Sequence, residues 1–178
     1  MHNIEYKAEL RDMALAKAAC TAVGAKFIIS LEQTDTYFRV PSGRLKRRVC
    51  EGEPTEWIFY DRANQSRPRL STFTIYSNKE ARTRFGSTPL SVQVVVKKKR
   101  ELYMLDNVRI HLDTVESLGT FLEFEALVNP GYPVAACHAT IDNLRDAFNI
   151  AMGEPISCSY ADLVLQEQET ATANPPEA

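Results

Sequence analysis

The residues of this sequence that are best suited to chemistry are charged side chains that recur at every second position. Glu5 and Lys7 are separated by one residue, as are Glu123 and Glu125. Side chains alternate between the two faces of a β-strand, so each pair shares one face if its segment is extended. Basic side chains repeat with the same spacing at Arg44, Lys46 and Arg48 and at Lys98 and Arg100, and a mixed face carries Arg109, His111 and Asp113.

Faces of this composition suit a polyphosphate together with a divalent metal ion. Arg and Lys bind phosphate oxygens well, and basic side chains that share a surface repel each other unless an anion lies between them. Carboxylates repel phosphate, but they are ligands of Mg²⁺ and Mn²⁺, hard cations that also bind phosphate oxygens. The pattern therefore predicts a channel that binds a polyphosphate and a metal ion.

The opposite faces of the same segments are mostly apolar. Ile4 and Tyr6 flank Glu5, and Phe124 follows Glu123. A single charged strand face is usually solvated, but several in one small chain favour an enclosed charged interior. We expect helices to cover the apolar faces, so that the charged faces line a central channel. His111 by itself is more typical of a structural hydrogen-bonding residue than of an acid or base.

The elements that position these side chains are predicted from β-prone runs, helix formers and turn signals. A helix is expected between Asp12 and Gly24, a short helix and loop over 78–89, and further helices over 135–152 and 159–168. Short turns between consecutive strands predict antiparallel pairing, and eight strands can close a barrel. Strands are expected over 3–10, 26–40, 44–51, 56–62, 70–77, 91–104, 108–115 and 120–128.

The expected fold class is thus α+β, an eight-stranded antiparallel β-barrel with flanking helices. At 178 residues the chain suits one domain, which we place at residues 1–168, followed by a disordered tail at 169–178. The net charge of −2 conceals a basic middle: residues 39–100 hold 15 Lys and Arg against 5 Asp and Glu. Acidic flanks, an anionic ligand or both must balance that charge.

The cysteine pattern and the hydropathy indicate a cytoplasmic protein that does not bind membranes. The arrangement of its basic residues indicates that it does not bind nucleic acid. The four cysteines form no CxxC pair, which favours free thiols in the cytosol, and no apolar stretch is long enough to cross a bilayer. The three histidines lack the spacing of zinc ligands. The basic run Lys97–Arg100 alternates along a predicted strand without interleaved aromatic residues, which disfavours a nucleic-acid surface.

Several segments, in order and spacing from Asn3 to about Leu165, resemble the CYTH superfamily. This superfamily of triphosphate tunnel metalloenzymes includes class IV adenylate cyclases, thiamine triphosphatases and inorganic triphosphatases. The first strand resembles its ExExK signature, and the segment from Arg109 to Glu125 is the most similar stretch. The other similar segments are Gln33–Phe38 with Gly43–Arg48, Ile58–Arg62, Lys98–Tyr103 and Ser159–Leu163, the last typical of the cyclase-like branch.

The resemblance implies a tunnel and assigns residues to it. The metal ligands for one or two Mg²⁺ or Mn²⁺ ions would be Glu5, Asp113, Glu123 and Glu125, with Glu9 as a weaker candidate. Catalytic roles would fall to Lys7, Lys98 and Arg100. The triphosphate would be bound by Lys7, Arg44, Lys46, Arg48, Arg62, Lys98, Arg100 and Arg109.

One departure from the signature bears on activity, because Asn3 stands where the family has its first Glu. An Asn oxygen can bind a metal ion but carries no charge. The resemblance implies a triphosphatase acting on ATP, tripolyphosphate or thiamine triphosphate. The alternatives are a class IV adenylate cyclase, which releases cyclic AMP and pyrophosphate, and a protein that binds nucleotides or polyphosphate without turnover. The resemblance to the cyclase branch is also compatible with a homodimer.

Overall fold

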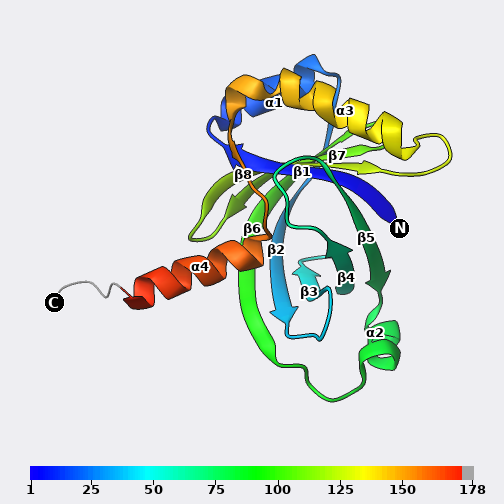
Figure 1. The fold of residues 1–178 in the computed structure, drawn as a ribbon, viewed down its shortest axis with the longest axis vertical. Helices are drawn as coiled ribbons and strands as arrows, with labels where there is room; N and C mark the ends of the chain where they lie inside the picture. The colour runs from blue at the N-terminus through cyan, green and yellow to red at the C-terminus, as the bar shows by residue number, and fades with distance from the viewer. Residues whose placement is uncertain (174–178) are drawn as a thin grey trace.

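The computed structural model of the protein describes residues 1–173, and its central feature is a curled antiparallel sheet (Figure 1). The strands follow the order β5-β4-β3-β2-β6-β7-β8-β1-β9, and pairing between β1 and β5 closes the first eight into a barrel. The predicted class and the eight-stranded barrel are confirmed. The strands are β1 (His2–Leu10), β2 (Lys26–Phe38), β3 (Arg44–Cys50), β4 (Glu56–Arg62), β5 (Arg69–Tyr76), β6 (Val92–Leu105), β7 (Val108–Val115), β8 (Gly119–Leu127) and β9 (Met152–Pro155).

Among residues 1–173, four α-helices flank the barrel: α1 (Met13–Ala22), α2 (Asn78–Phe85), α3 (Val134–Ala147) and α4 (Tyr160–Ala173). Asp12 caps α1 as predicted, because its side chain accepts a hydrogen bond from the backbone N–H of Leu15. None of the helices in the described part of the chain is both long enough and apolar enough to span a membrane. The four cysteines are free thiols, as the sequence predicts.

Two predicted boundaries near the C-terminus are wrong. The helix expected over 135–152 ends at Ala147, and after a short 3₁₀ helix the chain forms β9, which adds to β1 beside Ala8 and Leu10. The last helix continues to Ala173, so residues 169–173 of the expected disordered tail are helical. Residues 174–178 of that tail lie outside the described residues.

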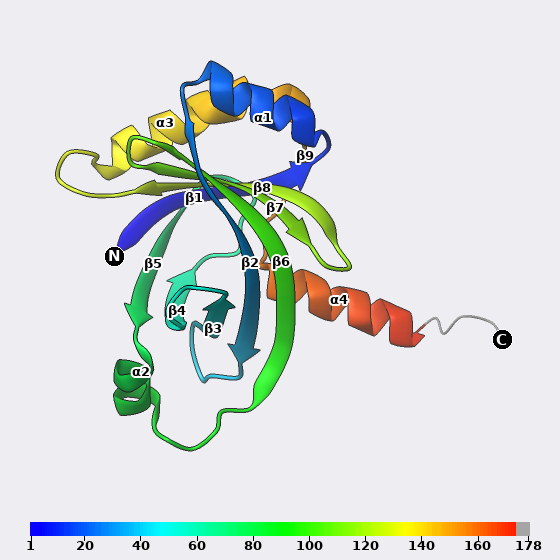
Figure 2. The same ribbon diagram turned by 180° about the vertical axis from the view of Figure 1, so that it is seen from behind.

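The main hydrophobic core lies on the outer face of β1, β7 and β8, beneath α1 and α3 (Figures 1 and 2). Alternation along these strands turns Ile4, Ile110 and Phe124 outward, where each is fully buried. Ile141 of α3 and Phe148 complete this layer. On β1, β7 and β8 the helices therefore cover the apolar faces and the charged faces point into the barrel, as predicted.

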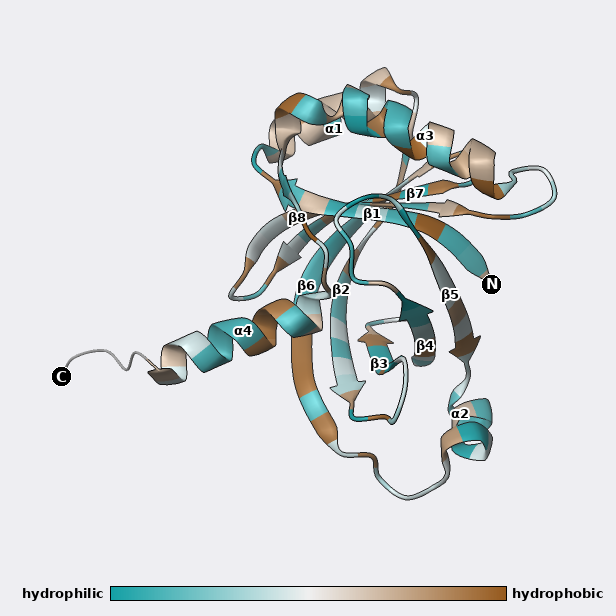
Figure 3. Cartoon of the chain, in the orientation of Figure 1, coloured by the Kyte–Doolittle hydropathy of each residue, from teal (hydrophilic) through white to brown (hydrophobic). Residues whose placement is uncertain are grey.

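A second apolar cluster fills part of the barrel interior. It includes Tyr37, Phe73 and Val96, and Tyr160 from the first turn of α4 joins it. β6 begins with a largely apolar segment and becomes hydrophilic in its middle, along residues 97–101 (Figure 3). Several members of this cluster, including Tyr37, Phe73 and Tyr160, lie beside the charged side chains of the interior.

Candidate functional site

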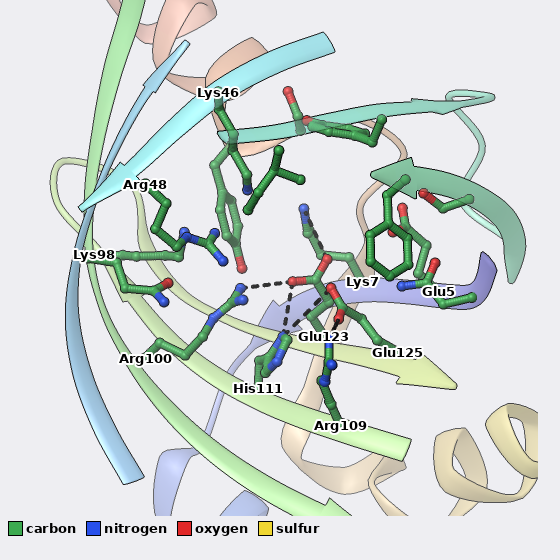
Figure 4. A pocket seen from close by; sticks show the side chains of 18 of the residues that line it. Glu5, Lys7, Lys46, Arg48, Lys98, Arg100, Arg109, His111, Glu123 and Glu125 are labelled. Atoms are coloured by element: carbon green, nitrogen blue, oxygen red, sulfur yellow. Dashed lines mark hydrogen bonds and ion pairs between the residues drawn. The ribbon is translucent and has the colours of Figure 1, made fainter. Parts of the chain in front are cut away.

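A cavity of about 350 Å³ lies inside the barrel and is lined by charged side chains from most of its strands (Figure 4). This volume is in the range of small-molecule sites. The cavity holds seven Lys and Arg side chains but only four Glu side chains, so its wall carries an excess of positive charge. These residues are Lys7, Lys46, Arg48, Arg62, Lys98, Arg100, Arg109, Glu5, Glu56, Glu123 and Glu125.

A single buried carboxylate, Asp35 on β2, holds three of these cations. Arg48 donates to both of its oxygens at 2.8 Å, and the ammonium groups of Lys98 and Lys46 lie 2.8 Å and 3.1 Å from Oδ2. The three strands meet here because β2 pairs with β3 on one side and with β6 on the other. One carboxylate therefore pairs with three basic side chains, and this cluster of four residues retains a net positive charge.

The charge imbalance around Asp35 changes the protonation of the cluster. Burial acts to raise the pKa of Asp35, but Arg48, Lys46 and Lys98 outweigh burial and hold that pKa well below its usual range. Burial, together with the nearby Arg48 and Arg100, lowers the pKa of Lys98 to about 7 despite Asp35. Burial and Arg48 lower the pKa of Lys46 to about 8. Both lysines can therefore gain protons near neutral pH when an anion enters the cavity.

On the opposite wall, Glu5 of β1 pairs with two buried arginines. The Nε atoms of Arg62 and Arg69 lie 2.6 Å and 3.0 Å from its Oε1. Burial raises the pKa of Glu5, and Arg62 acts against that effect. Arg69 also donates to the backbone carbonyls of Gln65 and Ser157. Within the described residues, Nη1 of Arg62 and Nη2 of Arg69 are buried without a hydrogen-bond partner.

Arg100 on β6 pairs with two carboxylates, and one of these also accepts a hydrogen bond from α4. It donates to both oxygens of Asp113 at 2.7 Å and to Oε2 of Glu123 at 2.9 Å. The phenol of Tyr160 donates to the same Asp113 at 2.7 Å. Asp113 is fully buried and does not line the cavity. Its position suits the orientation of Arg100 rather than the metal-ligand role expected from the sequence.

Three side chains at the end of the cavity could hold a metal ion. His111, Glu123 and Glu125 each offer a ligand atom, and these atoms lie within 4.8 Å of one another. Nδ1 of His111 lies 3.5 Å from Glu123 and 4.0 Å from Glu125, and Figure 4 shows the three together. Burial acts to raise the pKa of Glu123, but Lys7, His111 and Arg100 outweigh burial and hold it well below the usual range. The two carboxylates are typical ligands of Mg²⁺ and Mn²⁺, whereas the imidazole of His111 is more typical of Zn²⁺ and other transition metals.

Asn3, the departure from the family signature, lies in the same cavity. It is almost fully buried, and its Oδ1 atom accepts no hydrogen bond from the part of the chain that the structure describes. A buried amide oxygen without a partner is costly, and a metal ion or a metal-bound water would satisfy it. The donor set of His111, Glu123 and Glu125 therefore fits a divalent ion, and Asn3 offers a neutral oxygen in the same cavity.

The structure brings most of the predicted site residues together but places two elsewhere. Arg44 does not line the cavity: it donates to Asn64 at 3.0 Å and to Asp162 of α4 at 3.2 Å. Asp113 lies behind Arg100. Sequence reasoning missed Asp35, which pairs with three predicted phosphate ligands, and Arg69, which pairs with Glu5, a predicted metal ligand. For Asp35 a signal existed, since it shares a strand face with Gln33 and Tyr37, which both line the cavity.

Comparison with known proteins agrees with this architecture. The chain is similar to the PH1012 protein from Pyrococcus horikoshii OT3, with 25% identity, a TM-score of 0.71, and coverage of 90% of this chain and 98% of that protein. A putative adenylate cyclase from Vibrio parahaemolyticus is 14% identical over 93% of this chain and 98% of its own length, with a TM-score of 0.68. No curated protein matches the chain.

A third similar structure is a putative adenylyl cyclase from Hippeastrum described as having a dominant triphosphatase activity. It is 12% identical, covers 93% of this chain and 96% of its own, and has a TM-score of 0.61. Likeness at this identity indicates a shared fold. The family model of the CYTH domain matches residues 1–132, which is most of the chain, and the matched region includes every strand of the barrel. The chain belongs to the CYTH domain family.

Proposed function

We propose that the chain is a divalent-metal-dependent enzyme that binds a triphosphate in the barrel and hydrolyses one of its phosphoanhydride bonds. The observation that carries this proposal is a buried guanidinium nitrogen, Nη1 of the cavity-lining Arg62, that has no hydrogen-bond partner among the described residues. Leaving a buried donor unsatisfied costs about 1–3 kcal/mol, and more for a charged group. Phosphate oxygens are the acceptors that such nitrogens bind best.

The proposed substrate ligands surround the cavity from several strands. Lys46, Arg48 and Lys98 form one group around Asp35, and Arg62 and Arg109 face it from other strands. A triphosphate carries enough negative charge to neutralise the excess positive charge of the wall. Arg44, expected to bind the substrate, instead pairs with Asp162, and its proposed role is to hold the start of α4.

Catalysis would rest on positioning and on charge stabilisation. Lys7, Lys98 and Arg100 converge from β1 and β6, and they would stabilise the charge that develops on the phosphoryl oxygens. Glu123 and Glu125 with His111 would hold Mg²⁺ or Mn²⁺, which polarises phosphoryl oxygens and lowers the pKa of a bound water. Glu5 is already paired with two arginines, so its proposed role is to position Arg62 and Arg69 rather than to bind the metal ion.

A second candidate function is adenylate cyclase, in which a ribose 3′-hydroxyl attacks the α-phosphorus and pyrophosphate leaves. The observation that favours it is that Ser159 and Tyr160, from the segment similar to the cyclase branch, line the cavity. The third possibility is binding without turnover, which Asn3 motivates because it removes one carboxylate from the signature.

Product analysis tests the three functions together. The purified protein is incubated with ATP, tripolyphosphate or thiamine triphosphate, in Mg²⁺ or Mn²⁺, and the products are separated by ion-exchange chromatography. Orthophosphate release supports hydrolysis, whereas cyclic AMP with pyrophosphate supports the cyclase. Calorimetric binding of a triphosphate without either product would overturn both enzymatic proposals.

A further inference from the structure

The first part of β2 forms an open strand edge. β6 pairs with β2 from Lys26 onward, but β3 pairs with it only from Gln33 to Phe38. Along Lys26–Glu32, the β2 edge, no strand of the described chain lies on the second side. Such an edge presents unpaired backbone N–H and C=O groups, which readily pair with an added strand.

The β2 edge is also unusually apolar for an exposed segment. Phe27, Ile28 and Ile29 are consecutive and expose 55%, 52% and 37% of their surface. Phe27 packs edge-on against Tyr103 of β6, at 5.4 Å between ring centroids, which extends the apolar surface onto the neighbouring strand. Natural proteins commonly place charges on open strand edges, so three exposed apolar residues in a row are typical of an interface.

We infer that two copies of the chain pair through their β2 edges, antiparallel and about a two-fold axis at Ile29. The segment is complementary to itself in this register. Lys26 of one copy lies opposite Glu32 of the other, at both ends of the paired segment, and Phe27 lies opposite Leu31. A two-fold interface requires this kind of self-complementarity, because the same surface serves both subunits.

The size and shape of the edge indicate a dimer of modest affinity. Only seven residues per copy take part, and the ladder between β2 and β6 has an irregularity between Phe27 and Ile29. A small interface of this kind dissociates on dilution. Lys26, Ile28 and Glu32 do not line the cavity, so substitutions there leave the proposed triphosphate site intact. Failure of the dimer and failure of the proposed function are therefore distinguishable.

Sedimentation equilibrium of the full chain across a wide concentration range tests the inference. We expect a monomer–dimer equilibrium, and we expect Ile28→Glu to raise its dissociation constant by roughly tenfold or more, because a buried carboxylate replaces an apolar contact. The matched control is Ile150→Glu, which replaces a side chain that is 75% exposed and distant from β2 in sequence. Circular dichroism verifies that each variant folds.

A charge exchange tests the register independently of the apolar contact. Lys26→Glu and Glu32→Lys each place like charges opposite each other and are expected to weaken the dimer. The double variant restores opposite charges and is expected to recover the wild-type dissociation constant. A wild-type chain that is monomeric throughout, an Ile28→Glu dimer as tight as that of Ile150→Glu, or a double variant as weak as the single ones would each overturn the inference.

Discussion

The phenol of Tyr160 donates a 2.7 Å hydrogen bond to Asp113, the carboxylate to which Arg100 also donates twice. This contact joins the first turn of α4 to β7 inside the barrel. The ammonium group of Lys7 lies 4.0 Å from the centre of the Tyr160 ring. The C-terminal helix therefore contributes directly to the arrangement of two cations that we place at the reacting phosphate.

The Tyr160–Asp113 contact predicts a measurable loss of stability when the hydroxyl is removed. Tyr160→Phe keeps the ring beside Lys7 but leaves one buried carboxylate oxygen with fewer donors. Hydrogen bonds to charged groups contribute about 1.5–3 kcal/mol, so we expect the free energy of unfolding in urea to fall by about that amount. Tyr132→Phe, at an exposed tyrosine, is the control. Equal stability of the two variants would contradict this role for the hydroxyl.

Asp113 is expected to differ from the proposed metal ligands when each is neutralised. Asp113→Asn should lower stability, because it weakens a buried ion pair with Arg100, but it should leave Mn²⁺ affinity near wild type. Glu125→Gln should weaken Mn²⁺ binding by roughly tenfold or more, since even outer partners of metal ligands have effects of that size. Electron paramagnetic resonance of free Mn²⁺ measures the Mn²⁺ affinity of each variant. If Asp113→Asn lost as much Mn²⁺ affinity as Glu125→Gln, Asp113 would be a metal ligand and this prediction would be wrong.

The lowered lysine pKa values predict proton uptake on ligand binding. At pH 8 Lys98, with a pKa of about 7, is largely neutral, and Lys46, with a pKa of about 8, is half-charged. A triphosphate favours their charged forms and raises both pKa values. Calorimetry of tripolyphosphate binding in buffers of different ionisation enthalpy should show more proton uptake by the wild type than by Lys98→Met, a difference from which protons lost by the ligand cancel. Equal proton exchange by the two proteins would disagree with this electrostatic description.

Lys98 also makes the free energy of unfolding depend on pH in a definite direction. The pKa of Lys98 is about 7 in the folded protein and about 10.4 in an unfolded chain. Between these values the unfolded state binds more protons, so the contribution of Lys98 to the free energy of unfolding rises with pH and is least favourable below pH 7. Urea unfolding from pH 7 to pH 9 should show a shallower rise for Lys98→Met. A steeper rise in that variant would contradict the lowered pKa.

Much of the fold could be predicted from the sequence because alternation determines which strand face is buried. Each of the eight predicted barrel strands is present, with ends within two residues of those expected. The face carrying Lys98 and Arg100 does point into the cavity. β9 was missed because Met152–Pro155 is short and contains Gly153 and Pro155, which rarely indicate a strand.

The pairing of charges inside the barrel could not be predicted in the same way. Alternation assigns a face, but the partner of each side chain depends on the register between strands and on where long side chains end. Asp113 shares the face of Arg109 and His111, yet its position opposite Arg100 in the β6–β7 ladder ties it to that guanidinium. Likewise, Arg69 reaches Glu5 only because β1 and β5 close the barrel.

The most direct test of the proposed function is phosphorus NMR of a triphosphate turned over by the wild type and by Glu123→Gln. With ATP, tripolyphosphate or thiamine triphosphate and Mn²⁺, we expect orthophosphate from the wild type. Glu116→Gln, at an exposed site on the turn after β7, should behave like the wild type, and Glu123→Gln should lose most activity at any Mn²⁺ concentration. Full, metal-dependent turnover by Glu123→Gln, or no turnover of any of the three substrates by the wild type, would contradict the proposal.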